Sequence, residues 1–141
     1  MVDQQGPRLA PERAHGSLPA PEDHLMNDVR IGFYRDRLTK RRQEVLATLR
    51  HLRKEQEGVE ENKQWIDPAA YQGRLDLLNC LTGWYLEEGA EIDHALTRIA
   101  ERNYGLCRAC RQAIDPRRLE AAPAADFCAP CMETRQGLRP M

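Results

Sequence analysis

The chain is poor in the residues that build a thick globular core. Aromatic residues make up only 6% of its 141 residues, whereas charged residues make up 30%. So few bulky apolar groups argue against a large central core and favour a thin, elongated fold with one apolar seam. The formal net charge is −1, so overall charge gives no argument for nucleic-acid or membrane binding.

The sequence also lacks a long hydrophobic segment. Nowhere do about 18 apolar residues follow one another, so no helix is predicted to cross a bilayer. Residues 1–26 are rich in proline and contain no apolar stretch, which predicts a disordered leader and not a signal peptide. Five cysteines without a secretory signal favour a reducing compartment, so we expect a cytoplasmic protein.

Two stretches carry an apolar repeat of seven residues. The repeat positions are Ile31, Leu38, Val45 and Leu52 in the first stretch, and Tyr71, Leu78, Tyr85, Ile92 and Ile99 in the second. The interleaved positions are Arg35, Arg42 and Leu49 in the first stretch, and Leu75, Thr82, Gly89 and Leu96 in the second. Such repeats predict two helices that pack as a coiled coil.

Short capping signals delimit these two helices. Asn27 or Asp28 is a suitable cap for the first, and Asp67-Pro68 marks the start of the second. The short link between them, roughly residues 58–66, forces the helices to run antiparallel. We therefore predict a helical hairpin over residues 27–102, with its tip at about 58–69, and Gly105 as a helix stop.

Four cysteines after the hairpin have the spacing of a metal site. Cys107 and Cys110 form one Cys-x-x-Cys pair, Cys128 and Cys131 form another, and seventeen residues separate the pairs. Four cysteines in this pattern predict one structural Zn²⁺, with no coordination position left open for catalysis. Residues 103–136 are thus expected to form a zinc finger with a short C-terminal helix, and residues 137–141 a tail. Cys80 is expected to be a free thiol.

The overall prediction is a mainly α fold: a long antiparallel two-helix coiled-coil hairpin with a small C-terminal four-cysteine zinc finger. The finger sequence also carries a specific pattern. It is made up of Tyr104, Gly105, Cys107, Cys110, Ile114, Arg118-Leu119-Glu120-Ala121, Pro123, Ala125-Asp126, Cys128 and Cys131. In this pattern the chain resembles the DksA/TraR family of bacterial regulators that act on RNA polymerase, and the resemblance covers roughly residues 28–135.

The resemblance implies a mode of action. Members of this family insert the coiled coil through the secondary channel of RNA polymerase toward the active site, while the finger supports docking outside. They do not bind promoter DNA themselves, and they often act together with the alarmone ppGpp. The resemblance therefore implies a transcription regulator with RNA polymerase as its partner, without direct sequence-specific DNA binding and without enzymatic activity. Consistent with this, the sequence shows no nucleophile–base pair.

The tip departs from the family pattern at one position. The family's Asp-x-x-Asp-x-Ala motif falls on Gln64, Asp67 and Ala69, so that Gln64 replaces the first acid. Between residues 55 and 67, five acidic residues and one basic residue give a local net charge of −4. We expect Gln64, Trp65, Asp67 and Ala69 to contact the partner. The alternative is a solvated turn in which Asp67 serves only as a helix cap.

A second departure concerns ppGpp. Ala122 stands where alarmone-responsive members tend to have arginine, so a phosphate-binding side chain is missing and a ppGpp response is doubtful. A different class of function also stays open at this point. The chain would then be a zinc-finger interaction module or a dimerising adaptor with another partner, and Arg35 and Arg42 would mark a site for an additional helix.

Overall fold

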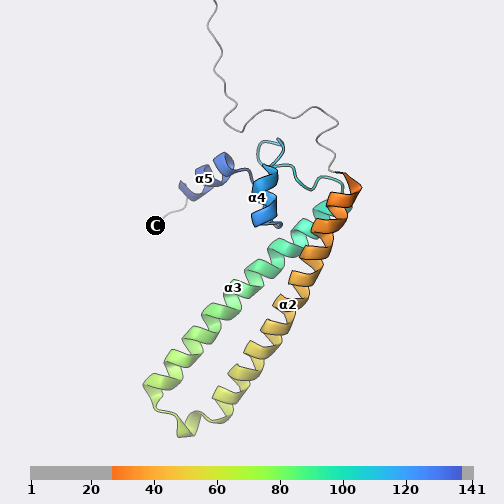
Figure 1. Cartoon of the computed structure of the whole chain (residues 1–141). Helices are drawn as coiled ribbons and strands as arrows, with labels where there is room; N and C mark the ends of the chain where they lie inside the picture. The colour runs from red at the N-terminus through yellow and green to blue at the C-terminus, as the bar shows by residue number, and fades with distance from the viewer. Residues whose placement is uncertain (1–26, 138–141) are drawn as a thin grey trace, which may run out of the picture.

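The computed structural model describes residues 27–137 and confirms the predicted fold class (Figure 1). Its elements are α2 (Asp28–Glu61), the 3₁₀ helix η2 (Lys63–Trp65), α3 (Pro68–Ala100), α4 (Pro116–Ala121) and α5 (Ala129–Gly137). Helices α2 and α3 run antiparallel and are joined at one end of the molecule, whereas α4 and α5 lie at the opposite end. The predicted leader, residues 1–26, and most of the predicted tail lie outside the described residues.

Helix α2 begins as its cap predicts, but part of its seam differs from the prediction. Asn27 Oδ1 accepts a hydrogen bond from the Val29 N–H at 2.7 Å. Leu38, Val45 and Leu52 are buried as predicted, and Val59 extends their repeat. The interleaved position near the N-terminus was wrongly assigned to Arg35, since Arg35 is exposed and Tyr34 is buried instead.

Tyr34 is buried because the finger covers it from outside the hairpin. Its ring centroid lies 5.8 Å from that of Tyr104, which belongs to the finger segment. A seven-residue repeat reports only the contacts between the two long helices, so it does not register this third partner. Arg42 has a partner within the hairpin, because its Nε lies 2.6 Å from Asp93 Oδ1 on α3.

Helix α3 confirms the predicted start and seam. Asp67 Oδ2 accepts hydrogen bonds from the N–H groups of Ala69 and Ala70 at 3.1 and 3.2 Å, and Pro68 occupies the first turn. Ile92 is buried, and the other predicted seam positions of α3 are half-buried. Gly89 lies close to α2, because a Cβ atom at this position would meet Val45 Cγ1 at 3.6 Å. The seam is therefore continuous but thin, as the composition predicts.

The turn between the helices is shorter than expected. Gly58 lies inside α2, which continues to Glu61, because Val59 is still buried against the partner helix. Asn62 then ends the helix, with its side-chain amide donating to the Gly58 carbonyl at 2.8 Å. The connection therefore consists of residues 62–67, with η2 at its centre.

The end of α3 also differs from the prediction. The helix stops at Ala100, and the residue with a left-handed backbone is Arg102, at φ 62°. The Asn103 N–H bonds to the Arg98 carbonyl and the Arg102 N–H to the Ile99 carbonyl, which is the Schellman arrangement. Gly105, at φ 87°, bends the chain again before the first cysteine. The helix therefore ends before the predicted glycine, and two successive turns lead the chain into the finger.

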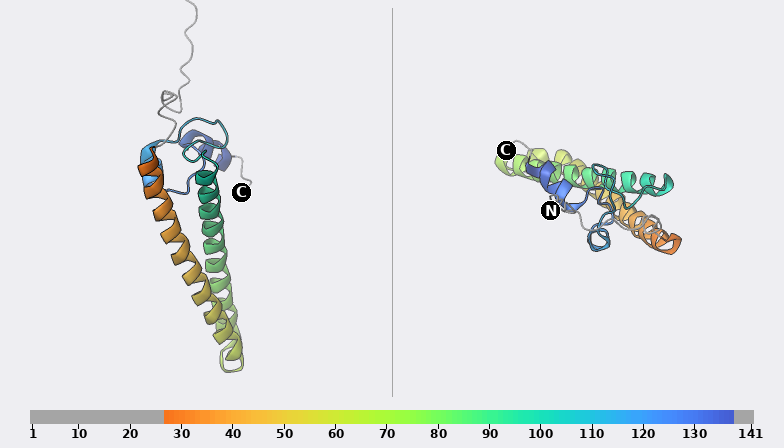
Figure 2. Two further views of the ribbon diagram at one scale, coloured as in Figure 1. Left: turned by 90° about the vertical axis from the view of Figure 1, so that its right-hand side faces the viewer. Right: turned by 90° about the horizontal axis from the view of Figure 1, so that it is seen from above.

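The finger packs on the open end of the hairpin and shares its core (Figure 2). One cluster of buried residues joins Tyr34, Leu38, Ile92 and Ala95 of the hairpin to Tyr104, Ile114, Leu119 and Phe127 of the finger. Tyr104 donates its hydroxyl hydrogen bond to the Pro123 carbonyl at 2.7 Å, which joins two finger loops. Buried Arg98 donates to the carbonyls of Asn103 and Leu106. Between residues 27 and 137, no helix is long and apolar enough to span a bilayer.

Candidate functional site

The four predicted metal ligands come together in the finger. The Sγ atoms of Cys107, Cys110, Cys128 and Cys131 all lie within 4.8 Å of one another. Cys107 and Cys128 are buried, whereas Cys110 and Cys131 are half-buried. Four cysteine sulfur atoms gathered this closely provide the ligand set that structural Zn²⁺ prefers, and no further protein ligand is needed.

Backbone hydrogen bonds shape the first cysteine pair into a knuckle. The Arg111 N–H donates to the Cys107 carbonyl at 2.9 Å, and the Cys107 N–H donates to the Gln112 carbonyl at 2.8 Å. Arg111 takes a left-handed backbone at φ 63°, which turns the chain back. The pair Leu106 and Ala113 forms an isolated antiparallel bridge that closes this loop.

The second cysteine pair lies at the start of α5. Cys128 directly precedes the helix, and Cys131 lies in its first turn, where the Met132 N–H bonds to the Cys128 carbonyl at 2.9 Å. The Arg108 N–H donates to the Asp126 carbonyl at 2.9 Å and so ties the first knuckle to the segment before the second pair. These backbone hydrogen bonds therefore position the two cysteine pairs so that their sulfur atoms face one another.

The electrostatics of the cluster fit a bound cation. Burial alone would raise the pKa of Cys107, but N–H groups of Cys110, Cys128 and Ala109 stabilise its thiolate and lower the pKa to about 6. Contact with the Cys128 thiol raises the pKa of Cys131 to about 12, and burial raises the pKa of Cys128. The Cys107 thiol thus ionises more readily than the thiols of Cys128 and Cys131. A divalent cation bound among the four sulfur atoms would favour their thiolate forms and cross-link the two knuckles.

Three arginines near the cluster have partners within the finger. Arg108 pairs with Asp126 at 3.1 Å, and Arg118 Nε donates to the Phe127 carbonyl at 2.9 Å. The guanidinium groups of Arg108 and Arg135 lie over the Phe127 ring at 5.7 and 4.5 Å from its centroid. The fifth cysteine, Cys80, is exposed on α3 and takes no part in the cluster.

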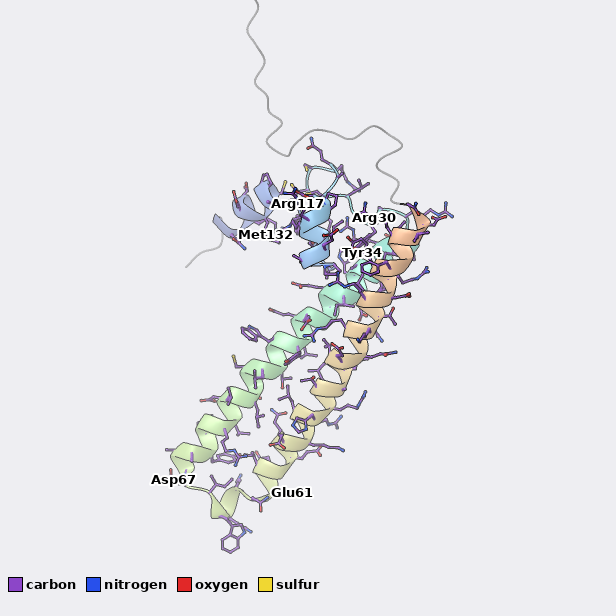
Figure 3. All side chains as sticks on the ribbon, viewed as in Figure 1. Arg30, Tyr34, Glu61, Asp67, Arg117 and Met132 are labelled. Atoms are coloured by element: carbon purple, nitrogen blue, oxygen red, sulfur yellow. The ribbon has the colours of Figure 1, made fainter. Side chains whose placement is uncertain are left out.

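The predicted tip residues lie together at the far end of the hairpin. Figure 3 labels Glu61 and Asp67 on the two sides of the connection. Gln64, Trp65, Asp67 and Ala69 are all exposed, and the Trp65 side chain is 79% exposed. Ile66 is half-buried, so of the two apolar residues before Asp67 only Ile66 packs partly into the hairpin.

The last turn of α2 contains acidic residues and no basic residue. Negative charge at the C-terminus of a helix opposes the helix dipole and so weakens the helix slightly. Glu60 has local partners, because the Tyr71 hydroxyl donates to its Oε1 at 2.6 Å and Lys63 Nζ lies 3.9 Å from its Oε2. The contact between Tyr71 and Glu60 joins α3 to α2, and the seven-residue repeat does not predict it.

A cleft lies between the hairpin and the finger, with a volume of about 640 Å³. Its hairpin wall includes Arg41, Glu88 and Glu91, and its finger wall includes Ala122 and Asp126. Arg41 Nε lies 2.5 Å from Glu88 Oε1, so this basic side chain is already paired. Burial and the nearby carboxylates of Asp126, Glu87 and Glu88 raise the pKa of Glu91. Sequence reasoning missed this cleft, although Glu88 and Glu91 are spaced to share one helix face.

Comparison with known proteins is consistent with this geometry. Residues 102–137 match the family described as the prokaryotic dksA/traR C4-type zinc finger. The RNA polymerase-binding transcription factor DksA of Buchnera aphidicola is 32% identical over 115 residues, which cover 78% of this chain and 73% of that protein. DksA of Escherichia coli K12 is 27% identical over 115 residues, which cover 79% of this chain and 74% of its own length.

A solved structure shares the fold. The transcription factor DksA2 from Pseudomonas aeruginosa superposes with a TM-score of 0.71 at 27% identity, covering 83% of this chain and 91% of that one. The finger match and the four clustered cysteines together confirm the predicted single structural zinc. The DksA relatives are transcription factors and not enzymes. The chain belongs to the DksA/TraR family of C4 zinc-finger transcription factors.

Proposed function

We propose that this chain regulates transcription in the bacterial cytoplasm by entering the secondary channel of RNA polymerase. In this proposal the hairpin tip points to the active site, and the finger stays outside. The observation that carries it is the exposed, acidic tip at one end of a rod whose other end holds the finger, in a chain of the DksA family.

The dimensions of the hairpin support insertion into a channel. Helix α3 has 33 residues, which at about 1.5 Å per residue gives a rod roughly 50 Å long. Two helices side by side are narrow, and their seam buries few large side chains. A fold of this shape gains little stability from its length, so the length itself calls for a function such as reaching a distant site.

The tip residues have distinct roles in this proposal. Asp67 caps α3 with one carboxylate oxygen, Oδ2, and remains exposed. The tip carboxylates would approach basic side chains or the active-site Mg²⁺ of the polymerase. Trp65 offers a large apolar surface beside them, and Gln64 and Ala69 complete the contact. The four cysteines have a structural role, since they hold the finger together around zinc.

We further propose that ppGpp has little or no effect through this protein. Ala122 presents no phosphate-binding group to the cleft, and Arg41 there is paired with Glu88. The other basic residues of the cleft, Arg37, Lys40 and Arg118, are balanced by the carboxylates that line it, so the cleft has no excess of positive charge to attract a polyphosphate. Tight ppGpp binding to the polymerase complex that depends on this protein would contradict the proposal.

Pull-down with core RNA polymerase followed by in vitro transcription tests the main proposal. The wild-type chain is expected to bind the polymerase. Asp67→Asn should also fold and bind, because Asn still caps a helix, but it should regulate less, because the tip carboxylate is gone. The matched control is Asp36→Asn, which removes an exposed acid at the finger end of α2. Absence of polymerase binding would overturn the proposal, whereas an unaffected Asp67→Asn variant would overturn only the role of the tip.

The adaptor function is less well supported. Its sequence argument was that Arg35 and Arg42 interrupt the apolar stripe and leave room for another helix. Arg42 instead pairs with Asp93 on α3, and Arg35 does not belong to the seam. Binding to a different protein in the same pull-down, without polymerase, would favour the adaptor.

A further inference from the structure

A small polar pocket lies where the end of α3 meets the first cysteine knuckle. Its volume is about 270 Å³, and it shares no lining residue with the cleft between hairpin and finger. The pocket is lined by His94, Arg98, Glu101, Asn103, Arg108 and Arg111. Three of these residues are arginines, and Glu101 is the only carboxylate among them. The lining therefore favours an anion, and a volume just below the usual range of small-molecule sites favours a small one.

Arg98 is a buried cation that lines this pocket. Only 5% of the residue is exposed, and its guanidinium donates to the carbonyls of Asn103 and Leu106. It forms no ion pair with any carboxylate in the described part of the chain. Burial lowers the pKa of Arg98, and attraction to Asp126 offsets this only in part. A buried guanidinium without a paired opposite charge is costly, so an anion bound beside it would reduce that cost.

The first knuckle supplies the other two arginines of the pocket. Arg108 Nη1 lies 3.1 Å from Asp126 Oδ2, and His94 Nδ1 lies 3.5 Å from the same oxygen. This carboxylate therefore already compensates Arg108. Arg111, in contrast, is exposed and forms no ion pair with any residue between 27 and 137. Its positive charge is available to a ligand.

The charge of the zinc cluster affects the choice of ligand. Four thiolates on one Zn²⁺ leave a net charge of about −2, which nearby arginines help to balance. Backbone N–H groups of Cys110, Cys128 and Ala109 already stabilise the Cys107 thiolate, so the cluster does not depend on guanidinium groups alone. Negative charge beside the pocket repels an extended polyanion more than it repels a single compact anion. The cluster therefore favours a small ligand over a nucleic acid.

We propose that this pocket binds the phosphate group of a small molecule, either free phosphate or a phosphate monoester. Guanidinium groups match phosphate oxygens through paired N–H donors, and three of them around one pocket suit a tetrahedral anion better than a planar carboxylate. The bound phosphate would link Arg98 of α3 to Arg111 of the knuckle and so help to hold the finger on the hairpin. This site is independent of polymerase binding.

Titration of the zinc-loaded full chain with inorganic phosphate tests the pocket. At a constant ionic strength of about 0.15 M, calorimetry and amide NMR spectra are expected to show saturable binding with a Kd of about 1 mM. The largest amide shifts should fall between residues 98 and 111. Arg111→Asn is expected to weaken binding at least about tenfold, because a hydrogen bond between charged groups is lost. Asn suits the left-handed backbone of this position, where φ is 63°.

Arg102→Asn is the matched control. Arg102 is also an exposed arginine with a left-handed backbone, at φ 62°, but it does not line the pocket. Its loss should leave phosphate affinity within about twofold, because salt screens charges outside the pocket. Both positions are exposed, so both variants should fold, which their amide spectra verify. Equal losses in the two variants, or unchanged affinity in Arg111→Asn, would overturn the proposal.

A second arm separates the sources of the phosphate group. Tighter binding of methyl phosphate than of inorganic phosphate would assign the pocket to a monoester, and equal or weaker binding would assign it to free phosphate. Absence of saturable binding of either compound below about 10 mM would overturn the proposal. Binding of a single-stranded oligonucleotide that requires Arg111 and that phosphate does not displace would assign this surface to nucleic acid, and it would overturn the proposal as well.

Discussion

The two ends of the hairpin are built in opposite ways. At the finger end, Tyr34 of α2, Ile92 of α3 and Leu119 of the finger are almost fully buried in one cluster. At the tip, Trp65 is 79% exposed, and the connection is held by local hydrogen bonds such as the Asp67 cap. The first end thus concentrates stability, and the second leaves its side chains free for a partner. The rod between them separates folding from function, so changes at one end are expected to leave the other intact.

Metal removal is expected to give the largest difference in stability between the finger end and the tip. Structural zinc supplies much of the folding free energy of such a finger, on the order of 10 kcal/mol. Chelation, or Cys107→Ser, should therefore unfold the finger and expose the apolar residues that it covers. Near-ultraviolet circular dichroism and amide NMR spectra would report the loss of finger structure, while signals from the tip should persist.

The control for this experiment is Cys80→Ser, because Cys80 is exposed and lies outside the cluster. This variant should keep both its zinc content and its melting curve. A finger that stays folded after complete loss of metal would contradict the structural role of the zinc.

Loss of the contact between the hairpin and the finger is expected to have the next largest effect on stability. Tyr34 is only 2% exposed, and its ring packs on that of Tyr104. Tyr34→Ala is expected to lower the free energy of unfolding by about 3–5 kcal/mol, since it leaves a cavity between the two parts. Denaturant unfolding measures this loss.

The neighbouring residue offers a matched control for Tyr34. Phe33 is 56% exposed, and Arg37 lies over its ring. Phe33→Ala should change stability by less than about 1 kcal/mol, because little apolar surface is lost. Equal losses in the two variants would mean that the finger does not hold the hairpin through Tyr34.

The same contrast explains what could be predicted from the sequence. The seam between α2 and α3 follows a seven-residue repeat, and the finger is defined by cysteine spacing. Both can therefore be predicted from local sequence patterns. Tyr34 was missed because its partner, Tyr104, lies 70 residues further along the chain. The end of α3 was missed because Arg102, and not a glycine, takes the left-handed backbone there.

The site shows the same division. The cysteines could be assigned as ligands because thiolate chemistry and spacing leave few alternatives. The cleft could not be assigned, because it depends on where the finger lies on the hairpin. Repeat patterns identify the residues that a helix buries, but they do not say which exposed face a partner uses.

Separating the two roles of Asp67 requires a smaller effect to be measured. Asp67→Ala removes the cap of α3 and is expected to cost about 1 kcal/mol of stability. Asp67→Asn keeps a capping oxygen, so its stability should stay close to that of the wild type while regulation decreases. The pair thus compares folding and function at one residue of the tip. Equal regulation by wild type and Asp67→Asn, combined with a loss in Asp67→Ala, would reduce Asp67 to a helix cap.

Two glycines, one in the rod and one in the finger, are expected to respond to substitution in opposite directions. Gly83 lies inside α3 with no atom within 4 Å of a Cβ placed on it, so Gly83→Ala should stabilise the hairpin by up to about 1 kcal/mol. Gly105 is buried and has φ 87°, so Gly105→Ala should destabilise the finger by roughly 1–2 kcal/mol. Thermal melts of both variants measure the two effects. Opposite signs would show that the finger depends on special backbone geometry while the rod is an ordinary helix, and a loss at both positions would contradict that difference.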